Sequence, residues 1–225
     1  MTHVRAVSNF ITACRERDIF IEPGKRHDLL TSRLFEVMDT FKPSLIMKVG
    51  IGTGSLLADM ARHTSANIIV VEPSMDLVRE FVADGRNADV LEKIRIINGS
   101  LVSLPVDYYA CDLLVCVDVL DLTDSSRAID EFRRVLQFDA HLFIGTTVLA
   151  DEDLDGIYDE LIHRIFPLHN DYYLASDLVT IMELNEFRMF REKTDFFRED
   201  VNALLKFFGE LYPDSPGGMD YLASM

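Results

Sequence analysis

The chain has 225 residues, of which 48% are hydrophobic, enough to bury the core of one α/β domain but few for two. Its 38 acidic residues outnumber its 22 basic ones, and the net charge of −16 repels the phosphate backbone of nucleic acids. No stretch reaches the roughly 18 uninterrupted apolar residues of a membrane span. We therefore expect a single-domain cytoplasmic protein without a nucleic-acid or membrane partner.

Three cysteines, Cys14, Cys111 and Cys116, are too few and too scattered for a disulfide framework or a zinc motif. Cys111 and Cys116 lie at the two ends of an apolar run, which predicts buried free thiols. We expect no metal ion as a cofactor.

The first 43 residues indicate two helices, around 7–17 and 28–41, separated by Glu22-Pro23-Gly24. Residues 44–148 then alternate short apolar runs with amphipathic stretches. Strands are expected at 45–49, 67–71, 94–97 and 112–117 and around 142–144, and the helices between them are expected to begin near Ser74 and near Asp124 or Ser125. Strands that are apolar on both faces indicate a parallel sheet covered by helices on both sides.

The expected fold is therefore a Rossmann-like, doubly wound α/β domain with a mostly parallel sheet and an N-terminal helical cap. Residues 149–225 form its helical C-terminal extension, with apolar stripes at 154–165 and 201–211. These tail helices could pack on the sheet or on a second subunit, so a homodimer remains open.

Three glycines stand at alternate positions in Gly50-Ile51-Gly52-Thr53-Gly54, between the first strand and the next helix. Ligands of doubly wound sheets bind at the carboxyl ends of the strands, where such a turn presents backbone N–H groups. A tight turn without a ligand would account for one glycine more readily than for three. The dinucleotide pattern Gly-x-Gly-x-x-Gly requires glycine where Ser55 stands, so NAD is disfavoured.

Further segments follow the loop in a characteristic order. Glu72 closes the second strand about 20 residues downstream, and Asn98-Gly99-Ser100-Leu101 follows the third strand. Residues 111–117 and 131–136 then supply a fourth strand and the end of a helix. Together with the loop, these segments resemble the class I S-adenosylmethionine-dependent methyltransferase family over about residues 44–148.

The resemblance implies S-adenosyl-L-methionine as the cofactor, with Glu72 accepting hydrogen bonds from the ribose hydroxyls. The cofactor-binding residues that it implies are Lys48, Gly50, Ile51, Gly52, Thr53, Gly54, Glu72, Pro73, Ser100, Leu101, Val117 and Asp118. It also implies a sixth strand at 188–194, and no convincing seventh strand is visible.

Two residues depart from the family pattern. Lys48 stands where an acidic residue is usual, and Ser100 stands where an aspartate usually lies next to adenine. A lysine near the cofactor's sulfonium and ammonium groups would repel them. Lys48 could instead reach Asp118 or Glu72, or bind the cofactor carboxylate, and the sequence does not decide among these interpretations.

The candidate acceptor-side residues are Asp118, Asp121, His169 and Tyr172. Methyl transfer from a sulfonium depends mainly on alignment, and a general base is needed only if the acceptor loses a proton. The favoured hypothesis is methyl transfer to a small-molecule acceptor. The alternatives are a non-catalytic binding or assembly protein of this fold, or a related enzyme with another nucleoside cofactor, such as an aminopropyl transferase or an NAD-dependent oxidoreductase.

Overall fold

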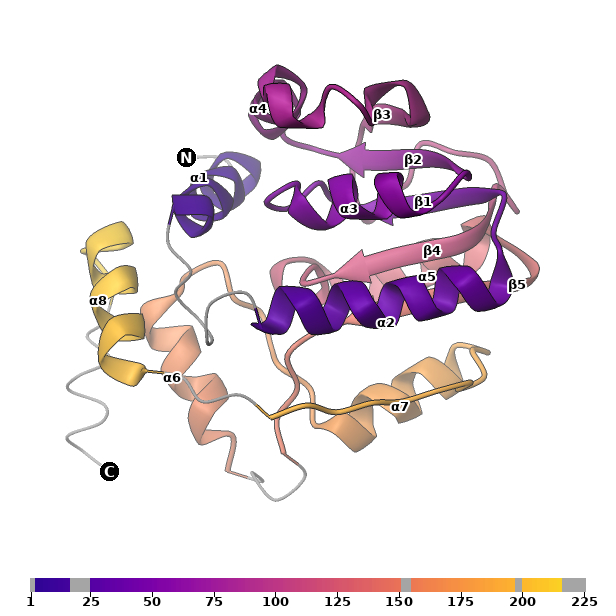
Figure 1. Cartoon of the computed structure of the whole chain (residues 1–225). Coiled ribbons are helices and arrows are strands. Elements are labelled where there is room, and N and C mark those ends of the chain that lie inside the picture. The colour runs from indigo at the N-terminus through magenta and orange to yellow at the C-terminus, as the bar shows by residue number, and fades with distance from the viewer. Residues whose placement is uncertain (1–2, 17–24, 151–154, 197–199, 216–225) are drawn as a thin grey trace.

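The computed structural model describes residues 3–16, 25–150, 155–196 and 200–215. Strands and helices alternate through its central part, as the sequence predicts (Figure 1). The strands are β1 (Leu45–Val49), β2 (Asn67–Glu72), β3 (Ile94–Asn98), β4 (Cys111–Val117) and β5 (Leu136–Gly145). The helices are α1 (His3–Glu16), α2 (Lys25–Phe41), α3 (Ser55–His63), α4 (Met75–Ala83), α5 (Ser125–Val135), α6 (Ile157–Ile165), α7 (Ala175–Leu184) and α8 (Val201–Leu211), and short 3-10 turns are η1 (Gly85–Asn87), η2 (Leu91–Lys93) and η3 (Leu120–Leu122).

The five strands form one sheet in the order β3-β2-β1-β4-β5, and every neighbouring pair is parallel. The chain builds outward from β1 to β3 and then returns to place β4 on the other side of β1. Such a reversal opens a crevice at the carboxyl ends of the two central strands. The expected Rossmann-like, doubly wound fold is confirmed, and this crevice is where a ligand site belongs.

Helices cover both faces of the sheet because successive strand residues point to opposite sides. Ile46 and Val115 belong to the core under α2 and α3, whereas Met47 and Cys116 belong to the core under α5 and α7. The predicted buried free thiols of Cys111 and Cys116 are confirmed.

Two helices begin at the capping residues that the sequence indicates. The Ser74 side chain accepts a hydrogen bond from the Leu77 N–H at the start of α4, and Asp124, not Ser125, caps α5 by accepting from the Arg127 N–H. Each cap satisfies a backbone donor that has no partner within its helix.

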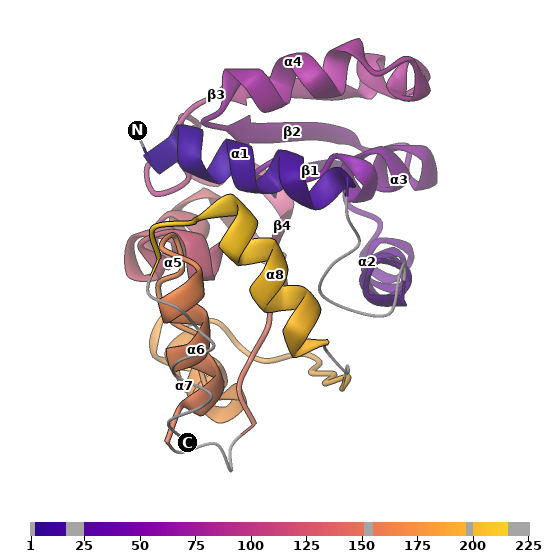
Figure 2. The same cartoon turned by 90° about the vertical axis from the view of Figure 1, so that its left-hand side faces the viewer.

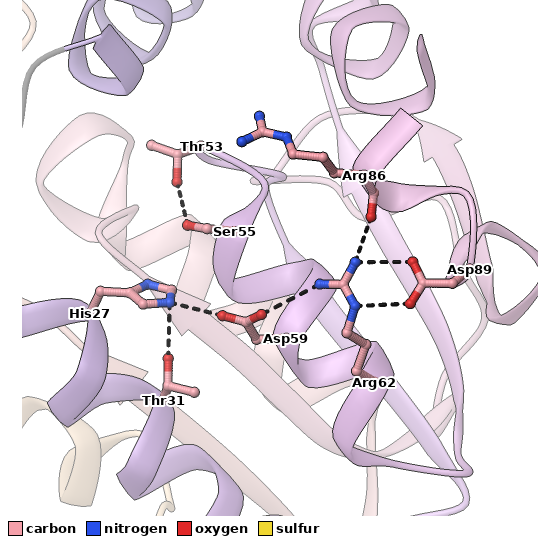
Figure 3. A network of polar contacts seen from close by, with 8 residues as sticks. All are labelled: His27, Thr31, Thr53, Ser55, Asp59, Arg62, Arg86 and Asp89. Atoms are coloured by element: carbon pink, nitrogen blue, oxygen red, sulfur yellow. Dashed lines mark hydrogen bonds and ion pairs between the residues drawn. The ribbon is translucent and has the colours of Figure 1, made fainter. Parts of the chain in front are cut away.

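A polar network fixes α3, the helix that follows the glycine loop (Figure 3). His27 on α2 lies 2.9 Å from Asp59 on α3. Arg62, one turn along α3, pairs with Asp89 at 2.9 Å and donates to the Arg86 carbonyl at 2.6 Å. These partly exposed pairs contribute modestly to stability, but together they join α2, α3 and the segment around η1.

Helices α1, α6 and α8 form a third core at the carboxyl end of the sheet. Phe10 of α1 packs on Phe166 and Phe208, with ring centroids 4.4 and 6.0 Å away. Figure 2 shows α1 and α8 in front of the strand ends. The predicted N-terminal cap and helical extension therefore meet over the crevice. No helix in the described ranges has the length and apolar character to cross a bilayer.

The predicted sixth strand at 188–194 is wrong, because these residues have no strand conformation and the described sheet ends at β5. The segment contacts α2 instead. Arg191 and Lys193 pair with Glu36, Asp195 lies 3.2 Å from Arg33, and the Phe190 ring packs edge-on against Phe41. These ion pairs and ring contacts replace the hydrogen bonds that a sixth strand would make with the sheet.

Candidate functional site

The glycine loop between β1 and α3 adopts a backbone that other residues rarely take. Gly50, Gly52 and Gly54 have φ angles of 75°, 63° and 87°, all in the left-handed region. A Cβ on Gly54 would lie 2.8 Å from the Phe81 ring, whereas a Cβ on Gly52 would meet no atom of the described residues within 4 Å. The loop is therefore tightly packed where α3 begins and open at its centre. Within the loop, the Thr53 hydroxyl lies 3.0 Å from the Ser55 hydroxyl at the start of α3 (Figure 3).

Glu72 lies beside this loop, as the sequence predicts, with only 3% of its surface exposed. Its Oε2 accepts from the Ile51 N–H at 2.8 Å, and its Oε1 accepts from the Ser74 N–H at 2.7 Å. The carboxylate thus ties the glycine loop to the start of α4.

The remaining predicted residues on this side lie at the ends of β2 and β3. Asn98 donates to the carbonyls of Glu72 and Pro73 and fixes the chain after β2. Ser100 is exposed and its hydroxyl accepts from the Val102 N–H, while Leu101 packs against the core. The Ile51 side chain is also buried in the core, so only its backbone faces the Glu72 carboxylate.

Lys48, on β1, contacts the first residue of the glycine loop. Its ammonium is buried and donates a hydrogen bond to the Gly50 carbonyl at 2.6 Å, and not to the Glu72 or Asp118 carboxylates. Burial lowers the pKa of Lys48 to about 8, although Cys116, Glu72 and Asp118 favour the charged form. The residue that departs from the family pattern therefore holds the first turn of the loop.

Lys48 predicts a specific dependence of stability on pH. Because its folded-state pKa is about 8 and its ordinary value is 10.5, the unfolded chain keeps this proton between those pH values and the folded chain loses it. Stability from this group should therefore rise as pH rises through that window, by on the order of 3 kcal/mol at about 1.4 kcal/mol per pKa unit. Urea unfolding of wild type and Lys48→Met at several pH values measures the difference. A difference that stays constant across the window would contradict this prediction.

An ion pair closes the crevice beside β4. Asp118 follows the strand with φ 53° and donates its N–H to the Gly145 carbonyl at 2.9 Å. Both its carboxylate oxygens accept from Arg26 at the start of α2, one of them at 2.6 Å. Burial disfavours the charged guanidinium, but Asp118 raises the pKa of Arg26 above its ordinary value. The sequence contains no signal for Arg26, which is 92 positions from its partner.

Asp121 lies on η3, the turn that follows Asp118. Burial and the nearby Asp118 carboxylate raise the pKa of Asp121 to about 7. Its Oδ1 atom is buried and has no hydrogen-bond partner among the described residues. Arg26 interacts electrostatically with Asp118, Asp121 and Tyr172. Three of the four predicted acceptor-side residues thus gather around one unpredicted arginine.

His169 is turned toward α6. Its buried ring lies with Nε2 2.7 Å from the Asp159 carboxylate, and its Nδ1 has no partner in the described part of the chain. The next residue, Asn170, donates its N–H to the Asp121 carbonyl at 2.7 Å. His169 therefore neighbours the acceptor side through the backbone, while its ring contacts a different carboxylate.

The comparisons with known proteins agree with this geometry. Residues 47–144, which run from β1 into β5, match the family model of a methyltransferase domain. This central part of the chain is therefore similar to a methyltransferase domain. No curated protein matches the sequence significantly.

Several solved structures share the fold of this methyltransferase domain. The YcgJ protein from Bacillus subtilis has a TM-score of 0.63 at 19% identity, over 71% of this chain and 68% of its own. Geranyl diphosphate C-methyltransferase from Streptomyces coelicolor has a TM-score of 0.59 at 14% identity, over 71% of this chain and 62% of its own. The cyclase SpnF has a TM-score of 0.59 at 20% identity, over 80% of this chain and 64% of its own. At these identities the likeness establishes the fold.

Proposed function

We propose that the domain transfers a methyl group from S-adenosylmethionine to a small-molecule acceptor. The observation that carries this proposal is the left-handed glycine loop with the buried Glu72 carboxylate bound to its Ile51 N–H. The spacing of the glycines disfavours a dinucleotide. The geranyl diphosphate C-methyltransferase was solved with S-adenosyl-L-homocysteine, and its structural likeness supports the same class of ligand here.

The residues at the crevice fit this cofactor. Gly52 leaves room for close approach to the main chain, and Glu72 supplies acceptors for ribose hydroxyls. The cofactor supplies an activated methyl group on a sulfonium, and the protein's contribution is mainly to align the acceptor with it. Helix α1 would cover the bound cofactor, since Ser8 is hydrogen-bonded to Ser74 at 3.0 Å beside Glu72. Lys48 donates to the Gly50 carbonyl within the loop.

A small acceptor is supported by the charge and by the cover over the crevice. The net charge of −16 opposes nucleic-acid binding. The arginines at the end of α5 are paired, Arg133 with Glu186 and Arg134 with Glu131, so they do not form a free basic patch. Helices α1 and α8 lie across the strand ends (Figure 2).

A labelling experiment tests the proposed reaction. The protein is incubated with S-adenosylmethionine carrying an isotopic methyl group, together with either a pool of small metabolites or total RNA. We expect the label to appear in a small molecule and not in RNA. Label transferred only to RNA would overturn the small-acceptor proposal, and binding without any transfer would favour the non-catalytic alternative.

Asp121 is proposed as the base when the acceptor must lose a proton. Its pKa of about 7 suits this role, because a base works best when its pKa lies near the working pH. Asp121→Asn should lower the methyl-transfer rate by about 100-fold and leave S-adenosylhomocysteine binding within a few-fold of wild type. An Asp121→Asn rate equal to wild type would exclude this role.

A second candidate is a reaction other than methyl transfer on the same fold. The structural likeness to the cyclase SpnF supports this second candidate, since one fold can carry out different reactions. It predicts that S-adenosylmethionine binds but that its methyl group is never transferred. The labelling experiment distinguishes the two functions.

A further inference from the structure

We propose that His163, His169 and Asp159 form a binding site for a divalent transition-metal ion on the acceptor side of the domain. Asp159 and His163 lie one helical turn apart on α6, and His169 follows shortly after the helix ends. One potential ligand atom from each of the three side chains lies within 4.8 Å of the others. The sequence analysis predicts no metal, so this site is a new inference.

The distances suit a tetrahedral site. Asp159 lies 2.7 Å from Nε2 of His169 and 3.5 Å from Nε2 of His163. Ligands held at about 2.0–2.1 Å from a tetrahedral zinc ion are separated by about 3.3 Å. Small side-chain rotations would therefore admit an ion. Asp171 lies 3.4 Å from His163 and is mostly exposed, but it stands outside this group of three, so water would complete the coordination.

The potential ligands are held in place by the surrounding structure. The Tyr172 N–H donates to Asp159 at 2.8 Å and orients its carboxylate. Asn170 fixes the segment between the ligands by bonding to the carbonyls of Asp121 and Thr123. Phe166, at the end of α6, packs on Phe208 of α8. A site whose ligands are already positioned loses less entropy when the metal binds.

Simple hydrogen-bonded Asp–His pairs are the alternative explanation. The chain has such pairs elsewhere, His27 with Asp59 and His63 with Asp39, and each contains one imidazole. Here two imidazoles, with ring centroids 4.6 Å apart, share one carboxylate. Two imidazoles with carboxylates are ligands typical of zinc and other transition metals, whereas Mg²⁺ and Ca²⁺ prefer all-oxygen sites.

The site has a consequence for the neighbouring acceptor residues. Asn170, which lies between His169 and Asp171, bonds to the backbone of Asp121. A bound ion would link α6 to this segment and so stabilise the wall of the acceptor side. The proposal concerns metal binding and holds whether or not the domain transfers methyl groups.

Calorimetric titration of the chelator-treated full chain with ZnCl₂ tests the site. We expect one ion per chain and a higher melting temperature that EDTA reverses. The partly exposed His163 is the ligand to replace, because the His169 side chain is fully buried and its loss endangers folding. His163→Gln should weaken zinc binding by about tenfold or more. MgCl₂ should produce neither effect.

His63→Gln is the matched control, since it removes one partly exposed histidine from an Asp–His pair on another helix. We expect it to bind zinc as wild type does. Two outcomes would overturn the proposal: no zinc binding by wild type, or zinc binding that His163→Gln leaves unchanged. Circular dichroism of both variants separates loss of the site from loss of the fold.

Discussion

Gly54→Ala is expected to lower the free energy of unfolding by about 2–5 kcal/mol. The left-handed backbone alone costs a residue with a Cβ about 1–2 kcal/mol, and Gly54 has φ 87°. The new methyl group would also lie 2.8 Å from Phe81, and such overpacking typically costs about 1–3 kcal/mol. Phe81 is buried in the main core, so it cannot move away freely. Urea unfolding measures the loss.

Gly52→Ala is the control for this prediction. Gly52 has φ 63°, but a Cβ there meets nothing within 4 Å, so only the backbone cost of about 1–2 kcal/mol applies. Gly54→Ala should therefore be clearly the less stable of the two variants. Equal losses would show that the contact with Phe81 does not determine the need for glycine at position 54.

Glu72→Gln is expected to abolish the response of the domain to S-adenosylhomocysteine, a ligand of the proposed site, as well as to destabilise the domain. Each carboxylate oxygen accepts a backbone N–H, one from Ile51 and one from Ser74. A glutamine can offer only one oxygen, so its NH₂ group would face a backbone donor. Losing a buried bond to a charged group costs about 1.5–3 kcal/mol. The rise in melting temperature that S-adenosylhomocysteine causes should disappear.

Asp112→Asn separates these two effects. Asp112 makes an equivalent link at the opposite, amino end of the strands, where its carboxylate accepts from the backbone of Ser44 and Leu45. We expect Asp112→Asn to lose stability but to keep the ligand-induced rise in melting temperature. If both variants respond to the ligand equally, Glu72 has a structural role only.

The central fold was predictable because its signals are local. The apolar runs predict β1 to β4 to within a residue at either end, and Ser74 indicates the start of α4 because serine is a common N-cap residue. β5 is longer than the expected core at 142–144, since edge position lets Phe138 and its neighbours stay exposed. The sixth strand failed because its segment meets α2 through ion pairs that no local pattern reveals.

The candidate site was predictable where one segment carries it and unpredictable where distant segments meet. The glycine loop and Glu72 follow from strand ends and spacing, and they lie together as expected. Arg26 reaches Asp118 across the sheet edge, and nothing in its own neighbourhood indicates that contact. The direction of Lys48 depended on a backbone carbonyl two residues away, which a sequence pattern does not show.

Calorimetric titration with S-adenosylhomocysteine, run beside NAD, tests most directly whether the glycine loop and Glu72 hold a nucleoside cofactor. We expect one molecule of S-adenosylhomocysteine to bind per chain, Glu72→Gln to remove that binding, and NAD to produce no heat. Saturable binding of NAD without binding of S-adenosylhomocysteine would contradict the proposed cofactor. If Glu72→Gln binds S-adenosylhomocysteine with wild-type affinity, that result would contradict the proposed role of the Glu72 carboxylate.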